Sequence, residues 1–365
     1  MKTSSFLLSP ENRVLFCTFL LGLFGILTIS SSQSHSIQPL HFVLRQSGFL
    51  CLGMIFLLSA RRVDFQKWQQ AACWLFGLFW LLLIYLPFSG LRINGMAGWF
   101  KAGSFTFQPS EVGRPFFLLA ATLLLVRSEK PLKNFFCSGI LAALWLVPVA
   151  AQPDFGTAAV YGISFMLLCY LAGISLKWLS LFPLAACALG SYALLTYPYV
   201  MRRLTGFLAP DQDPLGSGWH IRQFPLAVAR GGWSGSKIGS AVWSNAYLPF
   251  SYNDSAGATL LETLGLLGAF LPALLSVILI TALLELSLRK NLSRHAKLFI
   301  SGSGILLAVQ ILIHMGINLA LLPPSGLVLP FISYGGSSLT GLCLMLGIAL
   351  SASEDKCPET INKNT

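Results

Sequence analysis

Charged residues are scarce in this chain. Asp, Glu, Lys and Arg make up 10% of its 365 residues, whereas hydrophobic residues make up 55%. Because a soluble globular domain carries about 25% charged residues, this composition excludes a cytosolic enzyme with a polar shell. It also excludes an intrinsically disordered chain, which combines low hydrophobicity with a high net charge. A mean hydropathy of +0.71 indicates an integral membrane protein instead.

The sequence also lacks the short motifs of common soluble enzymes and of nucleic-acid-binding proteins. It contains no GxxxxGK[ST] phosphate loop, no HExxH zinc motif and no CxxC pair. The net charge is +11, yet no basic block with interleaved aromatic residues predicts a nucleic-acid partner. We therefore expect no nucleic acid, no metal site built from the protein's own ligands, and a reaction whose energy arrives with the substrate.

Long hydrophobic runs are abundant. A helix crosses the hydrocarbon core of a bilayer with about 20 apolar residues, whereas a transmembrane β-barrel shows shorter alternating segments. No repeat or long linker divides the chain. We predict a single transmembrane domain over residues 1–365, an all-α polytopic membrane protein with about ten spans, near 14–31, 42–60, 71–88, 110–126, 135–150, 157–175, 177–197, 259–287, 298–322 and 327–351.

The distribution of Lys and Arg predicts how these spans are oriented. With the N-terminus inside, 15 of the 24 Lys and Arg residues fall on the cytoplasmic side and 9 on the outer side, as the positive-inside rule requires. Both termini are therefore expected in the cytoplasm. The outer side holds one long loop, residues 198–257, between the seventh and eighth spans. Its Trp, Gly, Pro and Arg content favours a folded lid at the membrane surface.

Acidic residues near the outer ends of the spans are the first candidates for a functional site. An ionisable side chain at membrane depth costs about 2.5–3.5 kcal/mol on insertion scales, so it usually faces a partner or a watery cavity. Glu111 and Arg114 are three residues apart and can pair on one helix face, either as a structural ion pair or within a cavity. Asp154 fits either a helix N-cap or a charge that lines a cavity.

Asp254 lies just before the eighth span, in the string YNDS (252–255). Residues of these types commonly form a turn and a helix cap. A partly desolvated carboxylate at this place would alternatively have a raised pKa and act as a general base. Glu262 follows two turns later on the same face of the helix, and spacing alone does not choose between these roles.

The long outer loop carries more positive than negative charge. Its five cationic and three acidic residues leave a balance of +2, from Arg202, Arg203, Arg222, Arg230 and Lys237 against Asp211, Asp213 and Asp254. Guanidinium groups bind phosphate oxygens in pairs, so an anionic lipid headgroup or a pyrophosphate is a natural ligand. The alternative is that these long side chains simply reach the lipid headgroups.

Six strings follow one another in order along the chain: FTFQPSEVGR (105–114), QPDFGTA (152–158), RRLTGFLAPDQDPLGSGWH (202–220), ARGGW (229–233), YLP…ND…E..G (247–265) and LLPPSGLVLPFISYGGSS (321–338). Together with the ten-span layout, they resemble the SEDS family of shape, elongation, division and sporulation proteins, the RodA/FtsW/SpoVE family. The resemblance runs from about residue 90 to 350.

The strings do not all favour the same subgroup of this family. ARGGW and YGGSS favour the division subgroup, whereas the Trp-His pair at 219–220 and the short termini favour the elongation subgroup. We expect the division subgroup.

The resemblance implies a peptidoglycan glycosyltransferase of the bacterial cytoplasmic (inner) membrane. Such an inverting hexosyltransferase polymerises lipid II, an undecaprenyl-pyrophosphate-linked disaccharide, at the outer face of the membrane, beside a class B penicillin-binding transpeptidase. It implies Asp254 as the catalytic base. It implies a set of substrate-binding residues, namely Glu111, Arg114, Asp154, Arg202, Arg203, Lys237 and Glu262. A divalent cation, Mg²⁺ or Mn²⁺, is the candidate cofactor at the pyrophosphate.

The sequence departs from the family pattern at several positions. Ala97 and Gly98 precede Trp99 where the family has an arginine, Phe224 stands at a serine position, and His314 stands at an asparagine position. Two alternative functions therefore accompany the enzyme: a lipid II flippase, or a catalytically weak scaffold for the transpeptidase. A flippase needs a polar path to the cytoplasmic side, and only Glu285 lies near the inner edge of a span, which favours the enzyme.

Overall fold

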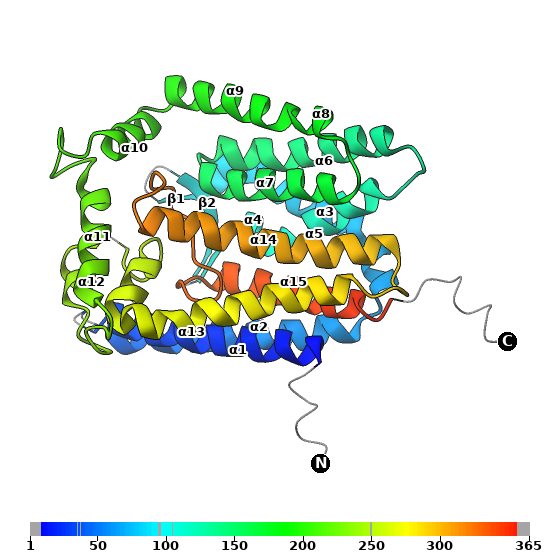
Figure 1. Cartoon of the computed structure of the whole chain (residues 1–365). Coiled ribbons are helices and arrows are strands. Elements are labelled where there is room, and N and C mark those ends of the chain that lie inside the picture. Colours follow the sequence, from blue (N-terminus) through cyan, green and yellow to red (C-terminus); the bar gives the residue numbers. More distant parts are fainter. Residues whose placement is uncertain are drawn as a thin grey trace, which may run out of the picture.

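The computed structural model describes residues 9–355 except 35, 37, 94, 95, 104 and 249. Both chain ends and Pro249 of the YLP string therefore lie outside the described residues. Long helices run alongside one another and form the body of the molecule (Figure 1).

Ten apolar helical segments of the described chain correspond to the ten predicted spans. Seven are long enough to cross a membrane by themselves: α1 (Pro10–Ser32), α2 (Pro39–Arg62), α3 (Phe65–Ser89), α6 (Pro131–Ala151), α8 (Leu176–Leu179) with α9 (Leu181–Thr196), α13 (Ala256–Ser287) and α14 (Arg294–Asn318). Three are shorter: α5 (Arg114–Leu125), α7 (Phe155–Leu171) and α15 (Gly336–Ala352). A one-turn helix, α4 (Pro109–Val112), precedes α5.

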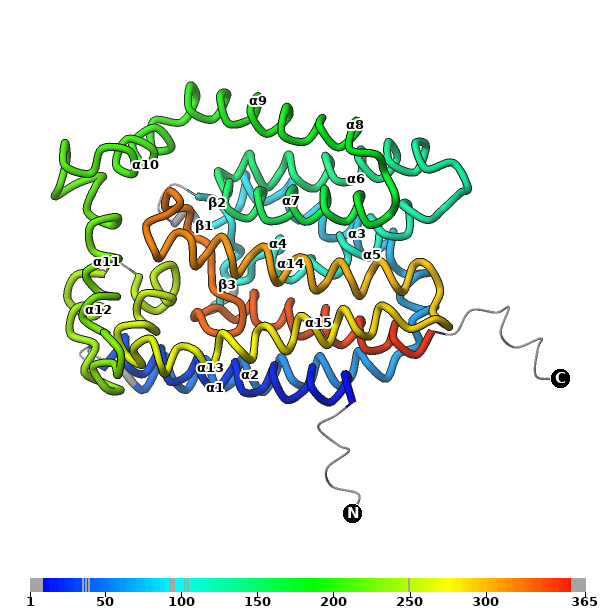
Figure 2. Tube along the Cα trace, viewed as in Figure 1, coloured from blue at the N-terminus to red at the C-terminus, as the bar shows by residue number. Residues whose placement is uncertain are grey.

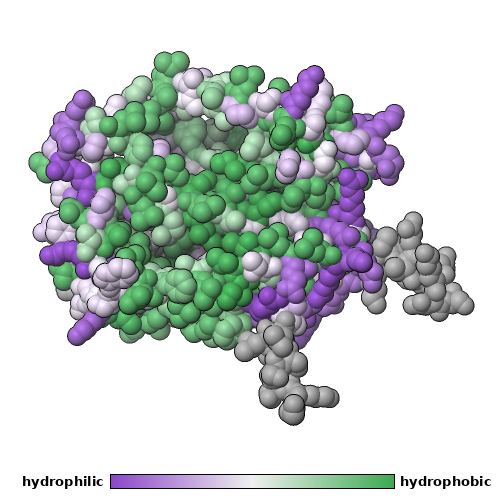
Figure 3. Space-filling view, in the orientation of Figure 1, coloured by the Kyte–Doolittle hydropathy of each residue, from purple (hydrophilic) through white to green (hydrophobic). Residues whose placement is uncertain are grey.

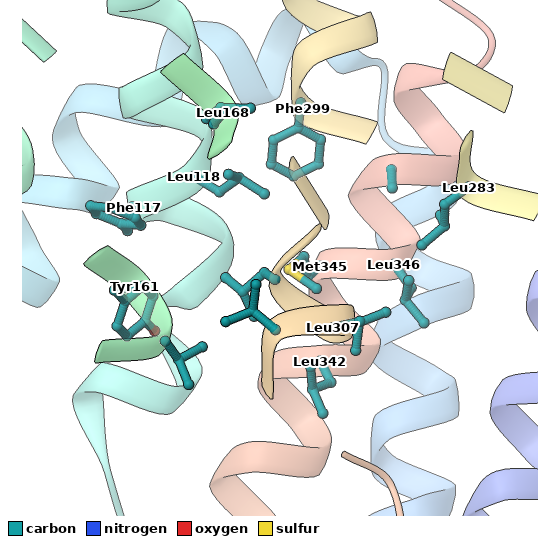
Figure 4. Close-up of a cluster of buried hydrophobic side chains, with 14 of the residues drawn as sticks. Phe117, Leu118, Tyr161, Leu168, Leu283, Phe299, Leu307, Leu342, Met345 and Leu346 are labelled. Carbon is teal, nitrogen blue, oxygen red and sulfur yellow. The ribbon is translucent and has the colours of Figure 1, made fainter. Parts of the chain in front are cut away.

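The core lies where α5, α7, α14 and α15 meet. Figure 4 shows side chains from these four helices in one cluster, among them Phe117, Tyr161, Phe299, Leu307 and Met345. All five are at most 1% exposed. The face shown in Figure 3 is hydrophobic along the middle of the helices and hydrophilic at both ends of the bundle, as expected for helices that cross a bilayer.

One end of the bundle is held by ion pairs between distant segments. Arg289 contacts Glu11 at 2.5 Å, Arg13 pairs with Glu285, and a third pair joins α2 to the end of α15. The described ends of the chain therefore lie at the same end of the bundle (Figure 1). This agrees with the prediction that both termini share one side of the membrane.

The opposite end contains a small antiparallel sheet that was not predicted from the sequence. Its strands are β1 (Leu91–Ile93), β2 (Met96–Ala102) and β3 (Phe105–Phe107), in the order β1-β2-β3. Phe100 pairs with Phe107 across β2 and β3. The strands lie in the segment 89–109 that was predicted only as an outer loop, and they are too short to show a period of two in the sequence.

The predicted boundaries of the last two spans are wrong. The spans were predicted over 298–322 and 327–351, but α14 ends at Asn318 and α15 begins at Gly336. The intervening segment 319–335 has no helix, and several of its apolar residues, including Leu327 and Phe331, are nonetheless buried. Non-helical backbone at membrane depth is tolerated where protein covers it or where it lines a cavity, so hydropathy did not separate this loop from a helix.

The long loop predicted at 198–257 folds into three short helices that we call the lid: α10 (Pro198–Leu208), α11 (Trp219–Gly231) and α12 (Val242–Ala246). Figure 2 shows the lid passing down one end of the bundle from α9 to α13. Only 11% of the most apolar stretch of α8 and α9 is buried, and α9 lies apart from the other long helices (Figure 1).

A break in α13 attaches the lid to the bundle. Gly265 has φ +67°, a left-handed conformation that interrupts the helix. The backbone N–H groups of Leu266 and Leu267 donate instead to the carbonyl oxygens of Gly232 and Trp233, at 3.0 and 3.1 Å. The glycines of the strings ARGGW and E..G thus form a junction between α11 and α13.

Candidate active-site cavity

A cavity of about 280 Å³ opens at the end of the bundle that holds the sheet and the lid. Its wall is assembled from six segments that are far apart in the sequence: α2, the β2–α4 region, the start of α7, α10, the turn before α13, and the loop 325–338. Four of the predicted site residues line it, namely Glu111, Asp154, Arg203 and Asp254.

Asp254 lies in the turn immediately before α13. Among the described residues, no hydrogen bond or ion pair to its carboxylate is present, although its main-chain carbonyl oxygen accepts a bond from Asn318 Nδ2 at 3.0 Å. Burial raises the pKa of Asp254 to about 6; the charge of Arg203 opposes this rise and that of Asp154 adds to it. A carboxylate in this state is suited to accept a proton near neutral pH.

Asp154 combines the two roles that the sequence left open. One carboxylate oxygen caps α7 by accepting from the backbone N–H of Thr157 at 3.1 Å, and the other accepts from Gln108 Nε2 at 3.2 Å. The same side chain lines the cavity. Burial raises the pKa of Asp154 to about 6, against the hydrogen bond from Thr157.

Glu111 and Arg114 form a buried ion pair. Arg114 Nη2 lies 2.6 Å from Glu111 Oε2, and the two side chains are 2% and 5% exposed. Glu111 reaches the cavity wall whereas Arg114 does not. The pair anchors the α4–α5 junction beside the cavity, and a contact between Arg114 and a substrate stays a prediction.

Two arginines supply the positive charge of the wall. Arg203 comes from α10, and its guanidinium lies 5.4 Å from the centre of the Tyr199 ring. Arg45 comes from α2 and lies 5.8 Å from the centre of the Phe105 ring. Arg45 is one of the nine Lys and Arg residues predicted on the outer side, but it was not among the predicted site residues. No local motif marks it, because it reaches the cavity only through the packing of α2.

Three further predicted site residues lie away from the cavity wall. Arg202 in α10 and Lys237 between α11 and α12 are exposed and do not line the cavity. Glu262 is buried, and its carboxylate accepts from the backbone N–H groups of Trp243 and Ser244 at 2.9 and 2.7 Å and from Ser244 Oγ at 2.5 Å. Glu262 thus holds the start of α12, and the prediction that it shares a face with Asp254 is wrong because Asp254 precedes the helix.

Several buried polar atoms of the wall have no hydrogen-bond partner within the described residues. Asn253 Oδ1, Ser325 Oγ and Ser338 Oγ are buried and have no hydrogen-bond partner within the described chain. Buried polar groups are almost always hydrogen-bonded in native proteins. These atoms therefore favour a ligand rich in hydrogen-bonding groups. Two aromatic rings of the same wall, Tyr252 and Tyr334, pack edge to face at 5.8 Å.

The acidic side chains do not fit a resident divalent cation. Asp154 already accepts two hydrogen bonds and Glu111 is paired with Arg114. The described residues contain no group of three His, Cys, Asp or Glu side chains close enough to hold a metal ion. Asp254 alone offers one carboxylate, so a divalent cation would be held here only together with the phosphate oxygens of a substrate.

The residues at the departures from the family pattern are buried in the structure. Ala97 lies buried in β2, beside Trp99 of the cavity wall. Phe224 is 1% exposed and packs within the lid against His220. His314 is completely buried and hydrogen-bonded at both ring nitrogens.

Within the described residues, ten apolar helical segments and a cavity with charged and polar side chains at one end of the bundle define a polytopic membrane protein. More particularly, this chain belongs to the FtsW, RodA and SpoVE family, because the family model described as "Cell cycle protein" matches residues 11–357.

Relatives of similar length support this assignment. The chain is 34% identical over 363 residues to a probable peptidoglycan glycosyltransferase FtsW of Coxiella burnetii, covering 96% of this chain and 97% of that protein. It is 34% identical over 324 residues to the protein of the same name from Thioalkalivibrio sulfidiphilus, covering 86% and 80%.

Solved structures show the same fold. A chain from a peptidoglycan synthase complex that couples polymerization and crosslinking superposes with a TM-score of 0.79 at 26% identity, covering 94% of this chain and 98% of that one. The rod shape determining protein RodA of Thermus thermophilus superposes with a TM-score of 0.69 at 24% identity, covering 94% and 96%.

Proposed function

We propose that this protein is a peptidoglycan glycosyltransferase of the division subgroup that polymerises lipid II into glycan strands at the outer face of the cytoplasmic membrane. The observation that carries the proposal is the cavity itself, where the carboxylate of Asp254 and the guanidinium groups of Arg203 and Arg45 share one wall. The names of the relatives from Coxiella and Thioalkalivibrio support the substrate class.

The reaction needs one base and a site for the departing anion. Asp254 takes the proton of the acceptor sugar's 4-hydroxyl as that oxygen attacks the anomeric carbon of the donor. The bond from this carbon to the pyrophosphate oxygen breaks in the same step, so the α-linked donor becomes a β-linked product. The protein acts as an inverting hexosyltransferase, and the reaction uses the pyrophosphate as its leaving group.

The remaining charged wall residues either bind the donor or hold the wall together. Arg203 and Arg45 lie where a guanidinium would stabilise charge that builds up on the pyrophosphate. Asp154, through its bonds to α7 and Gln108, holds two parts of the wall together. Glu111 does the same for the α4–α5 junction.

We further propose that the chain works beside a class B penicillin-binding transpeptidase. The similarity to a chain of a peptidoglycan synthase complex supports this partner. The cavity end of the bundle then faces the outside and the ion-paired end faces the cytoplasm, as the distribution of Lys and Arg predicts.

The two alternative functions receive less support. A flippase needs polar groups along a path to the cytoplasmic end, and Glu285, the acid nearest that end of a span, is paired with Arg13. A scaffold does not need a desolvated carboxylate on a cavity wall. The polymerisation experiment below includes results that would support either alternative.

The test is glycan polymerisation by the purified full-length chain, alone and with its transpeptidase. With lipid II as substrate, the wild type should form polymer that a gel resolves. Asp254→Asn should lower the rate by about 10²–10⁴-fold, the typical contribution of a general base. Asp211→Asn, in the same loop but exposed and outside the cavity, is the matched control and should keep wild-type activity.

The outcomes separate the three functions. Polymer from the wild type and from Asp254→Asn alike would remove Asp254 from the chemistry. No polymer from the wild type, with the transpeptidase shown to be bound, would instead support the scaffold, and transfer of lipid II across vesicle membranes would support the flippase.

A further inference from the structure

His314 and Asn318 lie one turn apart on α14, at its end nearest the cavity. Both are completely buried. Neither lines the cavity. Their side chains nevertheless contact each of the backbone segments that surround Asp254.

These two side chains cap α13 from a neighbouring helix. The first N–H groups of a helix have no partner inside it, and the N-cap residue Ser255 makes no side-chain capping bond. Instead, the N–H of Gly257 donates to His314 Nε2 at 3.2 Å, and the N–H of Ala258 donates to Asn318 Oδ1 at 2.9 Å. The packing is close, because a Cβ on Gly257 would lie 3.2 Å from His314 Nε2.

The same two side chains hold the turn and the loop on either side of the carboxylate. Asn318 Nδ2 donates to the carbonyl oxygen of Asp254 at 3.0 Å. His314 Nδ1 donates to the carbonyl oxygen of Leu327 at 2.8 Å. The preceding residue of that loop, Gly326, neighbours the carboxylate, since a Cβ there would lie in van der Waals contact with Asp254 Oδ2, at 3.7 Å.

The hydrogen-bond partners fix the protonation of the His314 ring. A carbonyl oxygen at Nδ1 requires a proton on that nitrogen. Two N–H donors at Nε2, from Gly257 and Asn318, require a lone pair there. The ring is therefore the neutral Nδ1–H tautomer, and a cation at this place would face the positive end of the α13 dipole.

From these contacts we infer that His314, together with Asn318, is a positioning residue that fixes the carboxylate of Asp254 through its backbone. The inference rests on the proposed function, in which Asp254 is the base. The carboxylate has no hydrogen bond of its own within the described residues, so its place depends on the turn, on the start of α13 and on the loop at 326–327. His314 and Asn318 bind all three.

Kinetics of polymerisation with purified full-length variants test this role. His314→Leu keeps a similar volume but removes the hydrogen bonds at both ring nitrogens. Because a misplacement of 1 Å can cost about 10²-fold in rate, kcat should fall by about 100-fold, whereas KM for lipid II should stay within about threefold because the cavity wall residues are unchanged. His314→Gln keeps an acceptor at the position of Nε2 and should recover most of the lost kcat.

A matched control lies on the same helix. His295 is also buried, and its Nε2 lies 3.2 Å from the Leu119 carbonyl oxygen and 3.0 Å from Thr122 Oγ1. It is 19 residues from His314, or about 28 Å along the helix. His295→Leu should lower thermal stability as much as His314→Leu does, but leave kcat of the folded protein unchanged.

Three results would overturn the inference. They are a wild-type kcat for His314→Leu, an equal loss of kcat in both leucine variants, and no recovery with His314→Gln. A wild type that makes no polymer, or an Asp254→Asn variant that makes as much as the wild type, would overturn the proposed function and with it the role of His314.

Discussion

Asp254 and Asp154 are two carboxyl groups on one cavity wall whose pKa values burial raises to about 6. They differ in what surrounds the charge. Asp154 accepts hydrogen bonds from Thr157 and Gln108, whereas the carboxylate of Asp254 accepts none from described residues. This difference suits Asp154 to a structural and binding role and leaves Asp254 available for proton transfer.

The pH dependence of polymerisation follows from the raised pKa of Asp254. A general base works only when deprotonated, so the rate should rise as the pH increases through about 6 and then level off. We call this rise the acid limb of the pH profile.

Two variants should shift the acid limb in opposite directions. Asp154→Asn removes a negative charge that raises the pKa of Asp254, so the acid limb should move to lower pH. Arg203→Gln removes a positive charge that lowers this pKa, so the limb should move to higher pH.

The initial rate measured from pH 5 to 8 checks these shifts. Asparagine is a good N-cap, so Asp154→Asn should keep α7 intact. Arg222→Gln alters an exposed arginine of the lid that pairs with Asp211, and it should leave the acid limb in place. Identical profiles for all four proteins would contradict the assignment of the limb to Asp254.

At the scale of elements, the lid is attached to α13 at two points. One is the break at Gly265, and the other is Glu262, whose carboxylate binds the first turn of α12. The motif glycines of ARGGW serve the first attachment. A Cβ on Gly231 would lie 2.1 Å from the carbonyl oxygen of Leu261, so this close approach requires glycine.

Replacing Glu262 should therefore loosen the lid. Glu262→Ala leaves the N–H groups of Trp243 and Ser244 without an acceptor. An unsatisfied buried donor costs about 1–3 kcal/mol, so the free energy of unfolding should fall by at least about 2 kcal/mol. Glu262→Gln keeps one acceptor oxygen and should fall between Glu262→Ala and the wild type.

Thermal unfolding in detergent measures this loss. Glu285→Ala is the control on the same helix. Glu285 and Arg13 form a partly exposed ion pair, and such pairs contribute about 0–1 kcal/mol to the free energy of unfolding. Equal destabilisation by both alanine variants would show that the hydrogen bonds between Glu262 and α12 stabilise the protein no more than a partly exposed ion pair does.

At the scale of the whole molecule, the two ends of the bundle differ in chemistry. The cavity, the sheet and the lid gather at one end, and ion pairs that join α1, α2, α13 and the end of α15 gather at the other. A middle zone of hydrophobic surface separates them (Figure 3). This division determines that the cavity can face only one side of a membrane.

Cysteine labelling tests which side that is. In a background without the eight native cysteines, a Thr205→Cys variant carries a thiol on exposed α10, and a Glu129→Cys variant carries one in the exposed turn between α5 and α6. A membrane-impermeant maleimide should label the first in intact spheroplasts. It should label the second only after permeabilisation, and the reverse pattern would contradict the predicted orientation.

The sequence alone determined the number and order of the spans, the long outer loop and the acids that mark the functional end. Whether a segment crosses a membrane depends on the summed hydropathy of its residues and on the cost of burying its charges. A window of about 20 residues is enough to calculate both quantities. The strings QPSEVGR, QPDFGTA and YNDS could likewise be read locally, and Glu111, Asp154 and Asp254 do line one cavity.

Only the tertiary structure decided which side chains share that cavity. Arg45 reaches it from α2 while Arg114, only three residues from Glu111, points into the core. Glu262 turns to α12, and the apolar segment 319–335 forms a loop instead of a helix end. Each of these outcomes depends on contacts between segments distant in the chain, whose energies no local pattern of residues records.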